Sequence, residues 1–127
     1  MKLFVYGTLL HGEPNHRVLE GATLLYTGSK LQAKMYDTGS GYPAVELGMG
    51  STIVGDIYEI HNQMWSKLDD LEGYTSNPTT DLYSKEIVHV QTPDGQIEAF
   101  IYTICDESMK LYEIPSGDWK VYRQSLK

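Results

Sequence analysis

The feature that most constrains the fold is a pair of alternating segments near the carboxyl end of the chain. Residues 82–90 and 96–104 both alternate apolar and polar side chains, which is the period of a half-buried strand. Between them, QTPDGQ carries Pro93, Asp94 and Gly95, a strong signal for a tight hairpin turn. Strands joined by so short a turn run antiparallel, so we expect a sheet that contains this hairpin.

The remaining segments predict more strands than helices. We expect four further strands, at residues 2–6, 22–27, 31–36 and 52–60. Residues 37–51, DTGSGYPAVELGMGS, are dense in Gly and Ser and predict a long loop with at most a short strand at residues 44–47; such a long loop is usually functional. We also expect a turn-rich loop at residues 11–16, a short helix at residues 16–20, and a turn and terminal helix after residue 113. This pattern favours a small α+β domain with a curled, mostly antiparallel or mixed sheet.

Length and charge limit the classes of function. A chain of 127 residues has the size of one domain, so we expect a single domain over residues 1–127. The net charge is −7 and the ten Lys and Arg residues form no run, which argues against nucleic-acid binding and against binding to an anionic membrane. The single Cys105 excludes an internal disulfide framework and favours a cytoplasmic location. The apolar run in MKLFVYGTLL is too short to span a membrane and lacks a signal-peptide cleavage site.

Tyrosine is unusually frequent, with ten residues against two phenylalanines. A buried tyrosine packs as an aromatic ring but needs a partner for its hydroxyl group, so some of the ten could line a polar pocket. Most of them are expected to be ordinary strand residues, because tyrosine is a good strand former.

The stretch NQMWSKLDDLE predicts a helix over residues 62–72, with Asn62 as its N-cap, Gly73 as its stop and a loop over residues 73–80. At about 100° per residue, four apolar side chains form one stripe and two carboxylates fall on the solvated side. The stripe comprises Met64, Trp65, Leu68 and Leu71, and the two carboxylates are Asp69 and Asp70.

Glu72 lies on the shoulder of this stripe, four residues after Leu68 and seven after Trp65. A carboxylate turned toward an apolar core is costly to ionise, and the negative end of the helix dipole adds to that cost. Both effects raise a carboxyl pKa, which suits a general acid/base near neutral pH. On periodicity alone, the competing interpretation is a frayed, half-exposed residue at the helix end.

Most familiar catalytic and metal-binding patterns are absent from the sequence. The four histidines lack the spacing of a zinc site, and helical geometry points Asp69, Asp70 and Glu72 in different directions, so we expect no metal. Ser40 and Ser51 lack the strand-to-helix context of a nucleophilic elbow, and acidic neighbours of Cys105 would raise rather than lower its thiol pKa. Dinucleotide and phosphate-loop motifs are also missing, so we expect no cofactor.

What remains is the turn Tyr6-Gly7-Thr8-Leu9, the glycine-rich loop at residues 37–51, and Glu72. A glycine directly after a strand lets the backbone approach a ligand closely. Successive backbone N–H groups in such a turn can hold an anionic oxygen.

The order of motifs resembles the γ-glutamylcyclotransferase-like superfamily. VYGTLLHGEPNH is followed by TGSGYPAV, LDDLEGY, LYSKEIVHV, AFIYT and SGDW, so that the resemblance covers nearly the whole chain, from Phe4 to about Trp119. The branch it is most similar to contains small bacterial γ-glutamylamine cyclotransferases and the plant avirulence-induced-gene homologues. The resemblance implies a small mixed β-barrel with flanking helices and a pocket at its mouth.

The resemblance also implies an activity and a set of site residues. Members of the family convert a γ-glutamyl amide to 5-oxoproline and a free amine, without a metal or cofactor. Carried over by motif, Glu72 would be the general acid/base. The substrate-binding residues would be Tyr6, Gly7, Thr8 and Leu9 of the turn, with Tyr42, Pro43 and Tyr83 lining the pocket. The substrate's own α-amino group attacks its γ-carbonyl, which is consistent with the missing nucleophile.

Two departures from the family pattern bear on this interpretation. Lys85 stands near the place where the family often has an Arg, and its role is open. The turn reads YGTL rather than the YGSN of the mammalian γ-glutamylcyclotransferase branch, which favours γ-glutamylamine substrates over γ-glutamyl dipeptides. Two alternatives remain: a non-catalytic module that binds a small metabolite in the same pocket, and a structural or partner-binding domain. The leaving amine, the pathway and the oligomeric state are not determined by the sequence.

Overall fold

The hairpin near the carboxyl end forms as the sequence predicts. In the computed structural model, which describes residues 1–72, 83–104 and 107–126 apart from the Met49 side chain, β4 (Tyr83–Thr92) and β5 (Gly95–Ile104) pair antiparallel along their whole length. Gly95 follows the Pro93-Asp94 turn with a φ of 97°, a conformation that glycine adopts without a steric penalty. Leu82, where the first of these strands was expected to begin, lies outside the described residues, as does Cys105.

A second, longer hairpin departs from the sequence-based expectation. β2 (Thr23–Asp37) is one strand where two were predicted, and β3 (Pro43–Glu59) contains most of the segment predicted as a loop. The two strands pair antiparallel as far as the register Asp37↔Pro43. The predicted long loop at residues 37–51 is therefore wrong, and only a five-residue connection, residues 38–42, remains.

A bulge in β3 explains why its glycines resemble a loop in the sequence. Gln32 pairs with Thr52, whereas the next residue of β2, Ala33, pairs with Leu47, so residues 48–51 have no partner in the register. Gly50 lies in this segment with a φ of 104°. Glycine permits the backbone to depart from the pleat there, and the strand resumes on both sides.

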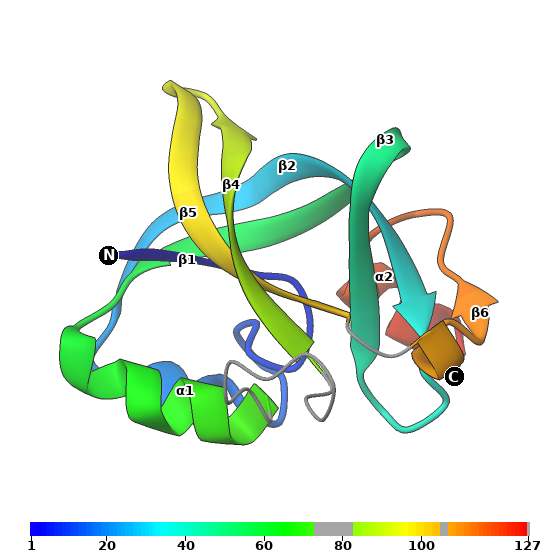
Figure 1. Cartoon of the computed structure of the whole chain (residues 1–127), viewed down its shortest axis with the longest axis horizontal. Helices are drawn as coiled ribbons and strands as arrows, with labels where there is room; N and C mark the ends of the chain where they lie inside the picture. Colours follow the sequence, from blue (N-terminus) through cyan, green and yellow to red (C-terminus); the bar gives the residue numbers. More distant parts are fainter. Residues whose placement is uncertain (73–82, 105–106, 127) are drawn as a thin grey trace.

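Five strands close into a barrel. β1 (Lys2–Val5) pairs with β3 on one side and β5 on the other, and the order β3-β1-β5-β4-β2 returns to β3 through the β2–β3 pairing (Figure 1). The β1–β5 contact is parallel and the others are antiparallel, which makes the sheet mixed. A two-residue strand, β6 (Tyr112–Glu113), pairs with the end of β2. The expected α+β fold, a small mixed β-barrel with flanking helices, is confirmed.

The helical segments are shorter than the sequence suggests. The helix expected at residues 62–72 is a 3₁₀ turn, Asn62–Met64, followed by α1 (Trp65–Glu72). His61 occupies the cap position, so the assignment of Asn62 as N-cap is wrong, and Gly73 lies outside the described residues together with the loop predicted at residues 73–80. The segment expected as a helix at residues 16–20 is a 3₁₀ turn, His16–Leu19.

The terminal helix is present as α2 (Trp119–Ser125), where the Asp118 side chain accepts a hydrogen bond from the Val121 N–H. A further 3₁₀ turn spans Glu107–Met109. No helix among the described residues combines the length and the apolar character needed to cross a membrane.

Close backbone contact in the barrel interior brings β1 against β3. A Cβ atom on Gly55 would lie 2.2 Å from the Val5 carbonyl oxygen, so only glycine fits there. Phe4, Ile57 and Ile101 are fully buried in the same core. This packing fixes the end of β1, from which the next loop emerges on the same end of the barrel as α1 (Figure 1).

Candidate active site

A cavity of about 460 Å³ lies where the end of β1 approaches α1. Its walls come from four separate parts of the chain: the end of β1 with the following loop, the connection before β3, the last turn of α1, and the strands β4 and β5. Cavities of this size are typical of sites for small molecules.

The loop after β1, which lines this cavity, has backbone N–H groups without a hydrogen-bond partner among the described residues. The carbonyl of Gly7 accepts from the Leu10 N–H at 3.0 Å, and the carbonyl of Thr8 accepts from the Asn15 N–H at 2.9 Å. The Leu9 carbonyl lies 2.9 Å from His16 Nδ1, so this nitrogen must carry the proton to donate. By contrast, within the described residues no hydrogen bond uses the N–H groups of Gly7, Thr8 or Leu9. Such a row of unpaired donors suits an anionic oxygen.

Gly7 is required by packing rather than by its backbone angles. A Cβ atom at this position would lie 2.6 Å from Pro43 Cγ and 2.8 Å from Pro43 Cδ. Pro43 in turn begins β3, and the connection before it is held by the Thr38 hydroxyl, which donates to the Tyr42 carbonyl at 2.7 Å. The YGTL turn and the GYPA segment, distant in sequence, therefore touch at the wall of the cavity.

Glu72, the last residue of α1, lines the same cavity. Its side chain is half-buried, and burial raises the pKa of its carboxyl group from 4.5 to about 7. The increase expected from the position of Glu72 on the helix is thus confirmed. A carboxyl group that titrates near neutral pH can both accept and donate a proton under physiological conditions.

The other two carboxylates of α1 do not share one solvated face. Asp70 is exposed and lines the cavity, whereas Asp69 is half-buried and accepts a hydrogen bond from the Tyr102 hydroxyl at 2.6 Å. Asp69 also forms an ion pair with Lys85 Nζ at 3.1 Å. The solvated position predicted for Asp69 is wrong because partners on β4 and β5 reach across to it. Leu71, expected in the apolar stripe, is 39% exposed and borders the cavity.

Four tyrosines form much of the cavity wall, and their hydroxyl groups are largely committed to the protein. The Tyr6 hydroxyl donates to the Tyr102 carbonyl, and the Tyr83 hydroxyl donates to the Pro43 carbonyl, each at 2.6 Å. The rings of Tyr42 and Tyr83 lie 6.4 Å apart. Burial is the main reason that the pKa values of Tyr6 and Tyr83 are raised, with the charge of Glu72 adding to both. Both tyrosines therefore stay neutral beside the carboxylate.

The structure brings every sequence-predicted site residue to one cavity, although their roles stay predictions. These residues are Tyr6, Gly7, Thr8, Leu9, Tyr42, Pro43, Glu72 and Tyr83. Sequence reasoning missed Tyr102, which lines the cavity and contacts Asp69. Tyr102 on β5 pairs with Lys85 on β4. The register of the predicted hairpin could therefore have placed Tyr102 beside Lys85. Sequence reasoning also missed Asn15, whose side-chain amide donates a hydrogen bond to Thr8 Oγ1 at 3.0 Å and so stabilises the loop after β1.

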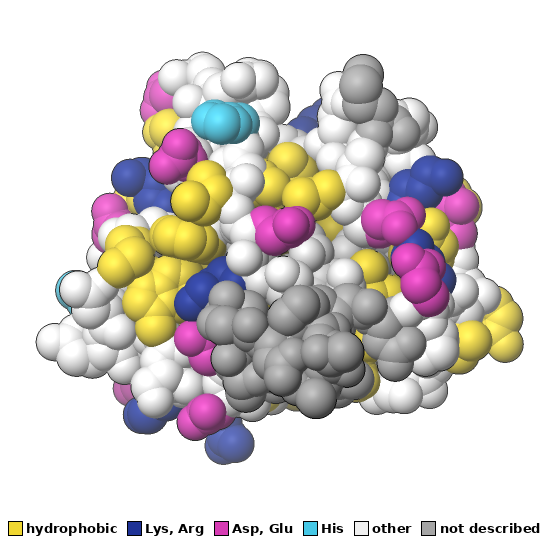
Figure 2. Space-filling view, viewed as in Figure 1, with side chains coloured by type: hydrophobic (Ala, Val, Ile, Leu, Met, Phe, Trp, Pro, Cys, Tyr) yellow, Lys and Arg dark blue, Asp and Glu magenta, His cyan; other side chains and the backbone are white. Residues whose placement is uncertain are grey.

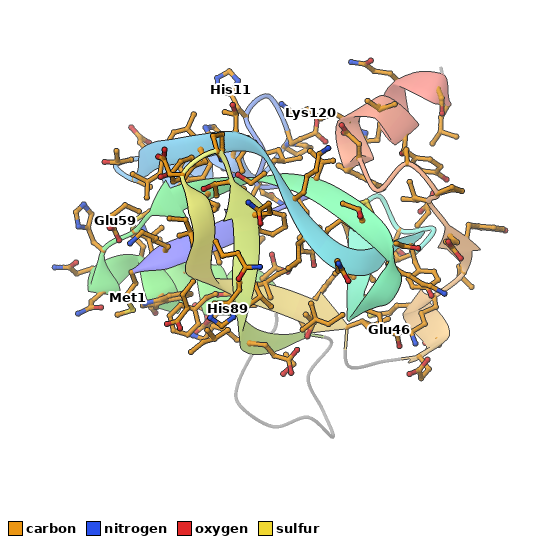
Figure 3. The ribbon with its side chains drawn as sticks, turned by 90° about the horizontal axis from the view of Figure 1, so that it is seen from above. Met1, His11, Glu46, Glu59, His89 and Lys120 are labelled. Carbon is orange, nitrogen blue, oxygen red and sulfur yellow. The ribbon has the colours of Figure 1, made fainter. Side chains whose placement is uncertain are left out.

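A second cavity and a surface of mixed charge lie outside the candidate site. A second cavity of about 440 Å³ lies between the loop at residues 11–14 and α2, where Figure 3 shows His11 and Lys120 on the same side of the molecule. On the face seen in Figure 2, acidic and basic side chains are interspersed. Across the part of the chain that the structure describes, no three His, Cys, Asp or Glu residues are grouped so as to hold a metal ion.

Comparisons with known proteins agree with this arrangement. The family model described as "Gamma-glutamyl cyclotransferase, AIG2-like" matches residues 3–121. The γ-L-glutamyl-butirosin B γ-glutamyl cyclotransferase of Niallia circulans is 33% identical over 95% of this chain and 76% of its own. The γ-glutamylaminecyclotransferase of Bos taurus is 32% identical over 91% of this chain and 73% of its own. The crystal structure of an AIG2-like protein from Mus musculus superposes with a TM-score of 0.78 at 27% identity, over 93% of this chain and 86% of that one.

The family match spans nearly all of the chain, and the solved structure has the same barrel. The matched range includes YGTL, GYPA and the helix ending in Glu72, which meet at the cavity. The chain therefore belongs to the γ-glutamyl cyclotransferase, AIG2-like family.

Proposed function

We propose that the protein is a cyclotransferase that converts a γ-glutamyl amine to 5-oxoproline and a free amine, with Glu72 as the general acid/base. One observation carries the proposal: the same cavity is lined by Glu72, whose carboxyl group has a pKa of about 7, and by a turn whose backbone N–H groups make no hydrogen bond within the described residues. Relatives of this chain bear the names of cyclotransferases, which favours catalysis over metabolite binding alone.

The reaction needs a proton carrier and no protein nucleophile. The Glu72 carboxylate takes a proton from the substrate's α-ammonium group, and the resulting amine attacks the γ-carbonyl carbon to close a five-membered ring. The protonated Glu72 then donates this proton to the leaving nitrogen as the amide C–N bond breaks. The regenerated carboxylate takes the second proton from the ring nitrogen and passes it to the departing amine, so that 5-oxoproline and an ammonium ion form. A single group of pKa near 7 can serve both steps because neither protonation state is costly at neutral pH.

The loop after β1 would supply the electrostatic part of catalysis. Negative charge develops on the γ-carbonyl oxygen as the ring closes, and preorganised N–H donors stabilise such an oxyanion. The α-carboxylate of the substrate needs donors as well. The N–H groups of Gly7, Thr8 and Leu9 would meet these needs, since none of them makes a hydrogen bond within the described residues.

The charge of the cavity supports a γ-glutamylamine rather than a γ-glutamyl dipeptide. Asp70 and Glu72 are the charged side chains among the described lining residues, and no Lys or Arg belongs to that set. A leaving group that carries its own carboxylate would meet repulsion from Asp70, whereas a neutral or cationic amine would not. This agrees with the preference expected from the YGTL turn.

The proposal is tested by incubating the purified protein with γ-glutamyl amines and γ-glutamyl dipeptides and measuring 5-oxoproline. We expect product from the amines, and we expect Glu72→Gln to reduce turnover by about 10²–10⁴-fold, the usual contribution of general acid/base catalysis. Glu20→Gln, at an exposed surface position, is the matched control and should retain activity. Absence of product from the folded wild-type protein with every substrate would refute the proposal, and full activity in Glu72→Gln would exclude Glu72 from the mechanism.

A further inference from the structure

α1 carries Glu72 but is fixed to the barrel by little apolar packing. Within this helix only Leu68 is fully buried, while Leu71 is 39% exposed and Trp65 is half-buried. A short helix with one buried side chain is held weakly by the hydrophobic effect alone. Other contacts must therefore set the position of its last turn.

A polar network on Asp69 provides such contacts. Lys85 Nζ lies 3.1 Å and 3.2 Å from the two carboxylate oxygens of Asp69, and the Tyr102 hydroxyl donates to Oδ1 at 2.6 Å. The side chains of Lys85 and Asp69 are 18% and 25% exposed. Partial burial and the shared carboxylate make this ion pair stronger than an ordinary surface pair.

The same lysine also rests on an aromatic face. Lys85 Nζ lies 4.1 Å from the ring centroid of Trp65, the first residue of α1, and the Trp65 ring meets Phe100 of β5 edge-on at 5.1 Å. A cation over a tryptophan ring is held in place by the ring quadrupole. Lys85 therefore contacts α1 at two points, one turn apart, from a single position on β4.

The network continues to the cavity through β5. Lys85 and Tyr102 are direct partners across the β4–β5 pairing, and the Tyr102 carbonyl accepts the hydrogen bond from Tyr6. Asp69 lies three residues before Glu72, so the two residues are neighbours along one side of the helix. Contacts made by Asp69 thus fix the helix within one turn of the carboxyl group that lines the cavity.

We infer that Asp69, Lys85 and Tyr102 are positioning residues, which hold α1 against β4 and β5 so that the Glu72 carboxyl group stays inside the cavity. The inference rests on the proposed function, in which Glu72 moves the proton. Without the network, the last turn of α1 can move away from the strands, and the Glu72 side chain gains contact with water. Lys85 thereby acquires a role that the sequence alone left open.

The titration of Glu72 reports this positioning because burial is the cause of its raised pKa. The groups that face it are Tyr6 from the end of β1 and Tyr83 from β4, each electrostatically coupled to Glu72, together with Asp70 in the same cavity. Lys85 is not among the causes of the shift, so removing its charge tests geometry rather than direct attraction.

The experiment follows the Glu72 side-chain carboxyl signal by NMR as a function of pH in the ligand-free protein. In Lys85→Met and Tyr102→Phe we expect the pKa of Glu72 to fall from about 7 toward 4.5, by about one unit or more, as the group becomes hydrated. Lys85→Arg, which keeps the charge and the aromatic contact, should restore most of the shift. Lys67→Met, an exposed lysine on the same helix, is the matched control and should leave the titration unchanged.

A wild-type Glu72 titration in both Lys85→Met and Tyr102→Phe would overturn the inference, even if their melting temperatures fell, because a network that only stabilises the fold need not move this pKa. The milder Tyr102→Phe keeps the test available if Lys85→Met does not fold. The measurement requires no turnover, so a failure of the proposed function, seen as no 5-oxoproline from the wild-type protein, is distinguished from a failure of the positioning role.

Discussion

Replacing Glu72 by Gln should make the folded protein more stable at alkaline pH while removing its proposed activity. The side chain keeps its size and loses its charge, so the cavity no longer has to accommodate a poorly hydrated carboxylate. Since the pKa of Glu72 is raised from 4.5 to about 7, the folded protein binds this proton more tightly than the unfolded chain does. The contribution of Glu72 to stability is therefore largest below pH 4.5 and declines as the pH rises to 7.

The size of the effect follows from that shift. Each pKa unit corresponds to about 1.4 kcal/mol, so full ionisation of Glu72 costs the folded state about 3 kcal/mol. Between pH 5 and pH 8 the wild-type protein should lose about 2.5 kcal/mol of unfolding free energy relative to Glu72→Gln. For a domain of this length that is roughly 10 °C in melting temperature.

The assay is urea or thermal unfolding of wild type and Glu72→Gln at pH 5 and pH 8, with Glu20→Gln as the control at an exposed position. Comparing each variant with wild type at the same pH removes the contribution of every other titrating group. A stability difference between wild type and Glu72→Gln that is the same at both pH values would refute the reasoning, because it would show that Glu72 ionises with its ordinary pKa in the folded protein.

Three further predictions concern the same cavity. The acidic limb of kcat/KM for the wild-type protein should have its midpoint near pH 7, because activity requires the Glu72 carboxylate; a midpoint near 4.5 would contradict this. Gly7→Ala should lower the unfolding free energy by about 1–3 kcal/mol and raise KM, since its Cβ would overlap Pro43, and wild-type values for both would contradict the packing argument. Tyr83→Phe should lower the unfolding free energy measured by chemical denaturation by about 1–3 kcal/mol, because the buried Pro43 carbonyl loses its donor. Tyr112→Phe, at a 64% exposed position, should leave this free energy almost unchanged. Equal losses in the two variants would argue against the hydrogen bond.

The local pattern of the chain was sufficient for the elements with strong short-range signals. The β4–β5 hairpin follows from alternation and from the Pro93-Asp94-Gly95 turn, and both signals lie within the one continuous segment that forms the hairpin. The long β2–β3 hairpin could not be predicted in the same way. Its glycines at residues 48 and 50 satisfy a bulge whose existence depends on pairing with β2, and no local propensity encodes that pairing.

In the candidate site, too, the positions set by local spacing were predicted and those set by distant segments were not. Periodicity placed Glu72 beside the apolar stripe, and the raised pKa expected there is present, because the position of a side chain around a helix follows from residue spacing alone. The same reasoning placed Asp69 in solvent, where it does not lie, because its partners Lys85 and Tyr102 come from strands 16 and 33 residues away along the chain.

The sequence by itself determined the hairpin, the class of fold, the family resemblance and the candidate carboxyl group. Only the tertiary structure decided that the YGTL turn, Pro43 and Glu72 line one cavity, and that Lys85 contacts the helix that ends in Glu72. The physical reason is that local propensities act over a few residues, whereas the barrel closure that brings these segments together depends on strand pairings between distant parts of the chain.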